Sequence, residues 1–194
     1  MASRRVLLIG FGVIVCAAVL YFGWHRAGTN SFQAVFLPGG SIELDLSAGE
    51  FEIRGTSDNQ IKVDVDPGDL SATGCEVHVT GGHAKVRVDG PADSFRAVIY
   101  VPQQSHLKVN QTIGELRITN VEGDKYVGLN IGQIRIDMPP TDKVKSVDAA
   151  VTIGSVRAGP WRTNKGGFFR SFRAGGQGGY TVNAHLDIGD IELE

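Results

Sequence analysis

A short phrase built around one glycine occurs five times in this chain and limits the folds it can adopt. In each copy an alanine or isoleucine precedes the glycine, and apolar residues follow it two and four positions later. The copies are residues 48–53 (AGEFEI), 113–118 (IGELRI), 131–136 (IGQIRI), 153–158 (IGSVRA) and 188–193 (IGDIEL). A unit this short cannot bury its own apolar face, so the copies must stack on one another. The repeat therefore predicts a β-solenoid.

The glycine marks a change in the apolar periodicity. Before it the apolar residues keep a period of two, as Leu107, Val109 and Ile113 do. After it the parity switches, because Leu116 and Ile118 follow Ile113 by three and five positions. One extra residue at a glycine, with the apolar face regained at once, is typical of a bulge or a solenoid corner. We therefore expect each copy to be a strand, a glycine corner and a second strand.

The remaining domain sequence favours short strands joined by tight turns. Apolar and polar residues alternate over 42–46, and two alternating segments flank Gly81-Gly82, which is a signal for a two-residue hairpin. Between Gly154 and Gly189 lie enough residues for either an additional coil or an insertion. The predicted fold is all-β: a parallel β-solenoid (β-helix-like) with an N-terminal antiparallel hairpin section, preceded by one transmembrane helix.

The transmembrane helix is predicted from the apolar run Val6–Phe22, which has Tyr21 and Trp24 at its far end. Arg4 and Arg5 precede the run and predict an N-in orientation. A cleaved signal peptide is the alternative, although no small-x-small cleavage site follows the run. The predicted organisation is a short cytoplasmic N-terminus at 1–5, a transmembrane anchor at 6–24, a linker at 25–40 and an extracytoplasmic β-solenoid domain, periplasmic or at the cell surface, at 41–194.

The charge distribution argues against nucleic acid as a partner. Three of the 19 Lys and Arg residues, but none of the 21 Asp and Glu residues, lie in residues 1–26. The domain that follows is therefore acidic and lacks the basic surface that phosphate neutralisation requires.

The residue three positions after each glycine is the leading candidate for recognition. In the three central copies it is Arg117, Arg135 and Arg157, on the face opposite the apolar side chains. If these strands are adjacent, their guanidinium groups form a ladder with the strand spacing of about 4.8 Å. Guanidinium groups bind carboxylates through paired hydrogen bonds, which suits an anionic polysaccharide. A solvated outer face, neutralised by acids such as Glu115, is the alternative interpretation.

Other clusters give weaker signals, and we predict no catalytic, cofactor-binding or metal site. Three aspartates within 64–69 do not fit the spacing of a twelve-residue Ca²⁺ loop. Cys75, His78 and His83 are close in sequence, but alternation puts Cys75 and His78 on opposite faces.

An aromatic and basic segment precedes the last glycine-rich stretch. Phe168, Phe169 and Phe172 alternate there with Arg170 and Arg173. These side chains either cover the end of the solenoid, which is the favoured interpretation, or form a surface for a membrane or a partner.

Three stretches of the domain resemble the bacterial putative-adhesin family, a cell-surface β-solenoid domain of unknown function. Residues 97–102 (AVIYVP) with the restart at 107–109 are similar to the family's strand ending in Val-Pro. Residues 112–123 resemble its Gly-x-Leu-x-Ile coil, and residues 178–193 resemble its closing strand. The resemblance spans roughly residues 41–194 and implies a parallel β-solenoid on an anchored or exported protein. Its motifs are structural and carry no chemistry.

Together these features predict a non-enzymatic, membrane-anchored cell-envelope module for adhesion, scaffolding or sensing. Its expected partners are the membrane, through the N-terminal helix, and an envelope protein or an anionic polysaccharide. The alternatives are a carbohydrate-active β-helix enzyme, which would place converging acids along one face, and a structural subunit of a membrane complex.

Overall fold

The computed structural model describes residues 31–66, 74–90 and 95–194. In these residues eleven strands form one mixed sheet, in which most of the pairings are parallel. The strands are β1 (Ser31–Val35), β2 (Ser41–Thr56), β3 (Gln60–Asp66), β4 (Gly74–Thr80), β5 (His83–Asp89), β6 (Arg96–Pro102), β7 (His106–Thr119), β8 (Lys125–Ile136), β9 (Val144–Ala158), β10 (Thr163–Gly175) and β11 (Tyr180–Leu193). Two single-turn 3₁₀ helices, η1 (Thr141–Lys143) and η2 (Gly159–Trp161), flank β9.

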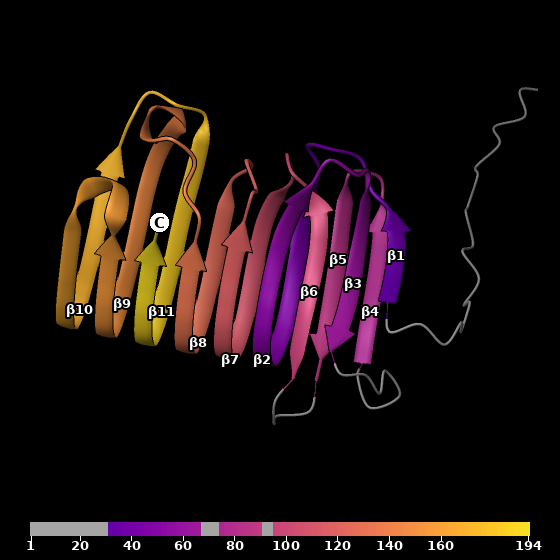
Figure 1. The fold of residues 1–194 in the computed structure, drawn as a ribbon, viewed down its shortest axis with the longest axis horizontal. Helices are drawn as coiled ribbons and strands as arrows, with labels where there is room; N and C mark the ends of the chain where they lie inside the picture. Colours follow the sequence, from indigo (N-terminus) through magenta and orange to yellow (C-terminus); the bar gives the residue numbers. More distant parts are fainter. Residues whose placement is uncertain (1–30, 67–73, 91–94) are drawn as a thin grey trace, which may run out of the picture.

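The sheet folds over itself at the repeated glycines. The first half of β2, before Gly49, pairs with β5, and its second half pairs with β6. The long strands β7, β8, β11 and β9 continue both halves in register on the other side. The result is two layers joined along a row of glycine corners, with the strands side by side from β10 at one end to β1 at the other (Figure 1).

Glycine is required at these corners by backbone shape and by close approach. Gly132 and Gly154 both have a φ of +141°, a region that side chains other than glycine rarely adopt. A Cβ on Gly132 would overlap the main-chain carbonyl of Gly114 on the neighbouring strand, and one on Gly154 would overlap that of Gly189. The five glycines therefore stack in a column that no side chain can enter.

The core lies between the two layers. In β7 the buried positions are Leu107, Val109 and Gln111 before the glycine, then Leu116 and Ile118 after it. The predicted change of parity at the glycine is confirmed.

The isoleucine that precedes four of the five glycines does not face the core, although the sequence pattern grouped it with the apolar residues that do. Ile113 and its equivalents lie on the outside of the corner with 42–46% of their surface exposed; these are Ile131, Ile153 and Ile188. The bend places this position at its apex, where neither layer covers it.

The order of the strands corrects the predicted parallel β-solenoid. Consecutive coils would place β9 beside β8, but β11 lies between them and pairs in parallel with both. The long spacing before Gly189 holds an insertion, β10, which runs antiparallel to β9. At the other end β3 pairs antiparallel with both β1 and β6. The hairpin around Gly81-Gly82 is present as β4 and β5, but the whole is a mixed sheet rather than a stack of successive coils.

The predicted membrane helix and localisation are also corrected. Within residues 31–66, 74–90 and 95–194, no helix is long and apolar enough to cross a membrane. This finding contradicts the transmembrane helix before the sheet and the single-pass, N-in placement with an extracytoplasmic C-terminal domain. Residues 6–24 themselves lie outside the described residues. Part of the stretch predicted as a linker, 31–35, is strand β1 and pairs with β3.

Candidate functional site

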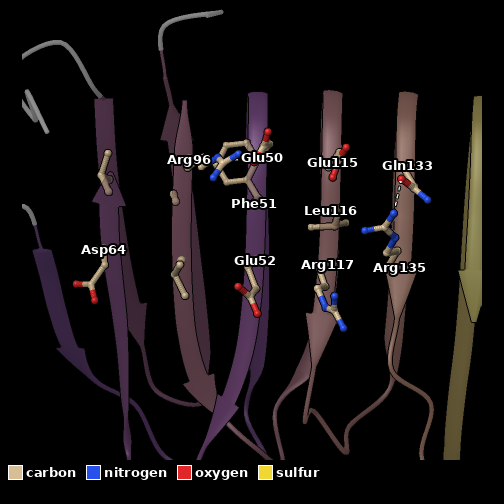
Figure 2. Close-up of a pocket in the computed structure, with 13 residues that line it drawn as sticks. Glu50, Phe51, Glu52, Asp64, Arg96, Glu115, Leu116, Arg117, Gln133 and Arg135 are labelled. Atoms are coloured by element: carbon tan, nitrogen blue, oxygen red, sulfur yellow. Dashed lines mark hydrogen bonds and ion pairs between the residues drawn. The ribbon is translucent and has the colours of Figure 1, made fainter. Parts of the chain in front are cut away.

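A hollow of about 390 Å³ lies on the outer face of one layer. It extends over β3, β6 and the second halves of β2, β7 and β8, and charged side chains surround it (Figure 2). Its ionisable lining residues are Glu50, Glu52, Asp64, Arg96, Glu115, Arg117 and Arg135.

Strand register brings these residues together. Positions one and three after the glycine point away from the core, since the apolar positions two and four are buried. Because the strands pair in register, equivalent positions form rows across the sheet with a spacing of about 4.8 Å. The row three after the glycine runs from Glu52 on β2 through Arg117 and Arg135 to Glu192 and Arg157.

Acidic groups predominate on one side of the hollow and guanidinium groups on the other. On the acidic side Glu50, Glu52 and Asp64 lie over β2 and β3, with Arg96 of β6 between these strands; on the basic side Arg117 and Arg135 lie over β7 and β8, with Glu115 also on β7 (Figure 2).

Neighbouring cations hold the acidic side in place. Arg96 Nε is 2.5 Å from Glu50 Oε2, and Lys62 Nζ donates to Asp64 Oδ2 at 2.7 Å. Arg54 Nε and Nη2 donate to the two oxygens of Glu52, each at 2.6 Å. The hydrogen bonds from Arg54 lower the pKa of the Glu52 carboxyl against the opposing effect of burial. Glu52 therefore stays ionised.

The structure divides the proposed arginine ladder. Arg117 and Arg135 are neighbours, but Arg157 is separated from Arg135 by β11, which places Glu192 between them. Arg135 Nε donates to Glu192 Oε2 at 3.1 Å, and Arg157 Nη1 donates to the other oxygen of the same carboxylate. This part of the row is neutralised, as the alternative interpretation expected.

Arg117 is the least constrained of the three arginines. Its Nη2 is 3.6 Å from Asp137 Oδ1 and 3.8 Å from Glu194 Oε2. Both separations exceed hydrogen-bonding distance, so its guanidinium donors are open to another acceptor.

Glu192 is a member of this charged row that the sequence reasoning missed. It occupies the position of Arg117 in the fifth copy of the repeat, three residues after Gly189. The repeat therefore shows a glutamate at the position of the arginines. That it lies between Arg135 and Arg157 follows only from the strand order, in which β11 lies between β8 and β9.

Lys125 is a second residue that was missed. It has no exposed surface, and its Nζ donates to the main-chain oxygen of Gly123 at 3.0 Å. Burial lowers the pKa of its ammonium group to about 8, against the opposing charges of Asp124 and Glu122. Its position in the strand indicates this burial, because Lys125 lies on the same face as the buried Val127 and Leu129.

The clusters considered for metals are dispersed. Asp64 accepts a hydrogen bond from Lys62, and Asp69 lies outside the described residues. His83 Nδ1 is hydrogen-bonded to the hydroxyl of Ser41, and burial raises the pKa of the Cys75 thiol to about 11. Across the described ranges no three His, Cys, Asp or Glu side chains are grouped as metal ligands.

The aromatic segment divides between its two interpretations. Phe172 is buried and packs against Trp161, with ring centroids 5.3 Å apart, so it helps to cover the end of the core. Phe168 and Phe169 are 68% and 81% exposed and belong to the surface.

A known structure shares the fold of this chain. A cell adhesion protein of Clostridium sporogenes, itself described as putative, superposes with a TM-score of 0.52 over 84% of this chain and 97% of its own, at 13% sequence identity. The two proteins share a fold. The resemblance inferred from the sequence is thus confirmed at the level of fold.

More distant likenesses carry the same kind of name. A putative adhesin of Parabacteroides distasonis matches 84% of this chain and 73% of its own with a TM-score of 0.30 and 13% identity. A putative adhesin of Bacteroides fragilis matches 84% of this chain and 96% of its own with a TM-score of 0.28 and 7% identity. No model of a known protein family matches the chain, and no curated protein matches it in sequence.

Proposed function

We propose that this sheet is a non-enzymatic recognition module of the adhesion type, and that the hollow is its contact surface. The fold shared with the cell adhesion protein of Clostridium sporogenes supports the class. The observation that carries the proposal is the arrangement of charge in the hollow. Groups of both signs border a common depression, mostly carboxylates over β2 and β3 and guanidinium groups over β7 and β8, on strands that main-chain pairing holds in register.

The geometry of the basic side favours a carboxylate-bearing polysaccharide. Arg117 and Arg135 project from adjacent strands, and among the described residues the carboxylates paired with the Arg117 guanidinium lie 3.6 and 3.8 Å away, beyond hydrogen-bonding distance. A sugar carboxylate can bind the Arg117 guanidinium through two parallel hydrogen bonds. The side-chain oxygens of Glu50 and Glu52 on the opposite side accept hydrogen bonds from sugar hydroxyls.

The same charges weigh against a carbohydrate-active enzyme. Glycoside hydrolysis needs one carboxyl group kept protonated beside a second carboxylate. Arg54 instead lowers the pKa of Glu52, and Glu50 is tied to Arg96. These pairings are suited to a fixed surface rather than to proton transfer.

The test is retention of the purified full-length chain on immobilised polygalacturonate, with uncharged dextran as the reference polymer. Wild type is expected to bind polygalacturonate and not dextran. The double variant Arg117→Ala/Arg135→Ala should lose at least tenfold in affinity, because the bidentate contact of the Arg117 guanidinium contributes about 1.5–3 kcal/mol and the positive charge of Arg135 beside it is lost as well. The matched control is Arg87→Ala, which removes an exposed arginine paired with Asp89 away from the hollow.

Three results would overturn the proposal. Equal binding of the double variant and wild type would exclude the hollow as the contact surface. Binding of neither polymer would exclude the carboxylate-bearing ligand. New reducing or unsaturated sugar ends released from polygalacturonate by wild type would contradict a non-enzymatic function.

A further inference from the structure

Strand β10 leaves one side of its main chain unpaired at the end of the sheet. It pairs with β9 along Thr163–Gly175, and no other described strand lies beyond it (Figure 1). At the opposite end the outermost strands β1 and β4 have 5 and 7 residues, whereas β10 has 13. A long row of N–H and C=O groups with no strand paired to it is a template for an added strand.

The side chains of β10 give this edge one sign of charge. Its ionisable residues are Lys165, Arg170 and Arg173, with no acid among them. Arg173 Nε is 2.8 Å from Asp148 Oδ2 on β9, so its charge is balanced within the sheet.

The other two cations are not balanced. Lys165 Nζ donates to the main-chain oxygen of Ser171 at 3.0 Å, and Arg170 Nε donates to that of Gly166 at 2.8 Å. In the part of the chain that the structure describes, neither cation lies within ion-pair distance of a carboxylate. Arg54, Arg96 and Arg135, in contrast, each contact one.

Exposed apolar surface lies between the two cations. Phe168 stands opposite Ile153 of β9 and continues the outward-facing isoleucines of the glycine corners, and Phe169 is the next residue. Phe169 has a φ of +51° and no partner on β9, so the regular edge is divided into 163–168 and 170–175. Each half can accept a strand of about six residues.

We propose that the free edge of β10 binds an extended acidic peptide segment of a partner protein as an added β-strand. Main-chain hydrogen bonds supply the pairing, carboxylates of the partner neutralise Lys165 and Arg170, and its apolar side chains cover Phe168 and Phe169. Charge decides the occupant. A second copy of β10 would bring like charges together without any acid on either strand, which disfavours self-pairing.

The experiment uses a fluorescent nine-residue peptide of alternating glutamate and valine, with blocked ends, and the full-length chain. Fluorescence anisotropy should show saturable binding. The double variant Lys165→Ala/Arg170→Ala should weaken it at least tenfold. Lys108→Ala, which removes an exposed lysine paired with Glu43 on another strand, should leave it unchanged. The same peptide methylated on alternate main-chain nitrogens keeps its charge but cannot pair, and should not bind.

Equal binding of the methylated and unmodified peptides would overturn strand addition, because it would show that the peptide binds through its negative charge alone. Equal binding by the double variant would exclude β10 as the site. Sedimentation that shows a dimer of wild type, strengthened in the double variant by the loss of like charges, would establish a second copy as the occupant and contradict the proposal. The hollow is a separate site from the edge of β10, so the variant Arg117→Ala/Arg135→Ala should bind the peptide as tightly as wild type does.

Discussion

At the scale of the residue, the path of the long strands depends on glycines, which have no side chain at the corner. Gly132 is held at a φ of +141° with the carbonyl of Gly114 where its Cβ would be. Strain in the backbone and overlap with a neighbouring main chain act at the same atom. Neither can be relieved by a change of rotamer, because both partners are backbone.

We therefore expect Gly132→Ala to destabilise the sheet by about 3 kcal/mol or more, through strain and steric overlap together. Gly128→Ala is the matched control on the same strand. It has no positive φ, and its Cβ would lie 3.7 Å from Asn110 Oδ1, which is ordinary contact. Urea unfolding followed by circular dichroism measures both; similar losses in the two variants would contradict the role assigned to the corner.

The buried amine of Lys125 makes stability depend on pH. Its pKa is lowered to about 8 in the folded chain from an ordinary value of 10.5. Below pH 8 the group is charged in both states, so the folded state bears the full cost of burying the charge. Between pH 8 and 10.5 the unfolded chain binds more protons, and stability rises with pH.

Lys125→Met should remove this rise and stabilise the chain at pH 7 by on the order of 3 kcal/mol, since 1.36 kcal/mol corresponds to one pKa unit. Urea unfolding of both proteins at pH 7 and pH 10 measures the difference, and the contribution of Cys75 cancels because both proteins retain it. Parallel pH profiles would show that Lys125 is not buried as a free amine.

At the scale of the element, β11 sets the charge of the outer face. Its Glu192 carboxylate lies between two arginine-bearing strands and contacts both guanidinium groups. These arginines are partly exposed, so the ion pairs stabilise the fold by about 1 kcal/mol or less. Their larger effect is to withhold Arg135 and Arg157 from other ligands.

Glu192→Gln should therefore increase the affinity for polygalacturonate severalfold while changing stability by no more than about 1 kcal/mol. Asp190→Asn is the control on the same strand, because Asp190 accepts a hydrogen bond from Ser155 at 2.5 Å and contacts neither arginine. Unchanged or weaker polymer binding by Glu192→Gln would count against the arginine row as a binding surface.

The sequence predicted those elements that follow from local alternation. The strands, the Gly81-Gly82 hairpin and the parity change at Gly114 depend on residues close together in the chain. The order of strands does not, because the pairing of β11 with both β8 and β9 depends on contacts between distant segments. The separation of Arg157 from Arg135 follows from that order, so the site could be predicted only in part.

At the scale of the whole molecule, β11 joins two halves that have no direct pairing with each other. β8 continues to β7 and β2 on one side, and β9 continues to β10 on the other. A stack of successive coils would lose only its last coil when its final strand is removed. Here the last strand is internal, so its loss divides the sheet.

A chain that ends at residue 178 should consequently lose its cooperative urea transition and become sensitive to protease. Replacing 163–175 with a Gly/Ser linker of equal length should keep the transition at a lower midpoint, because β10 is outermost and mostly exposed. Retention of a sharp transition after removal of β11 would contradict the bridging role.

The internal position of β11 also affects how the protein is made. On the ribosome β8 and β9 are synthesised well before β11, yet each must wait for it as a partner. Until residue 193 has left the exit tunnel, the nascent chain exposes two long, apolar strand edges that cannot close on one another. We expect completion of this sheet to follow the synthesis of β11 rather than accompany that of β8 and β9, and the interval before completion to be when the protein most needs a chaperone.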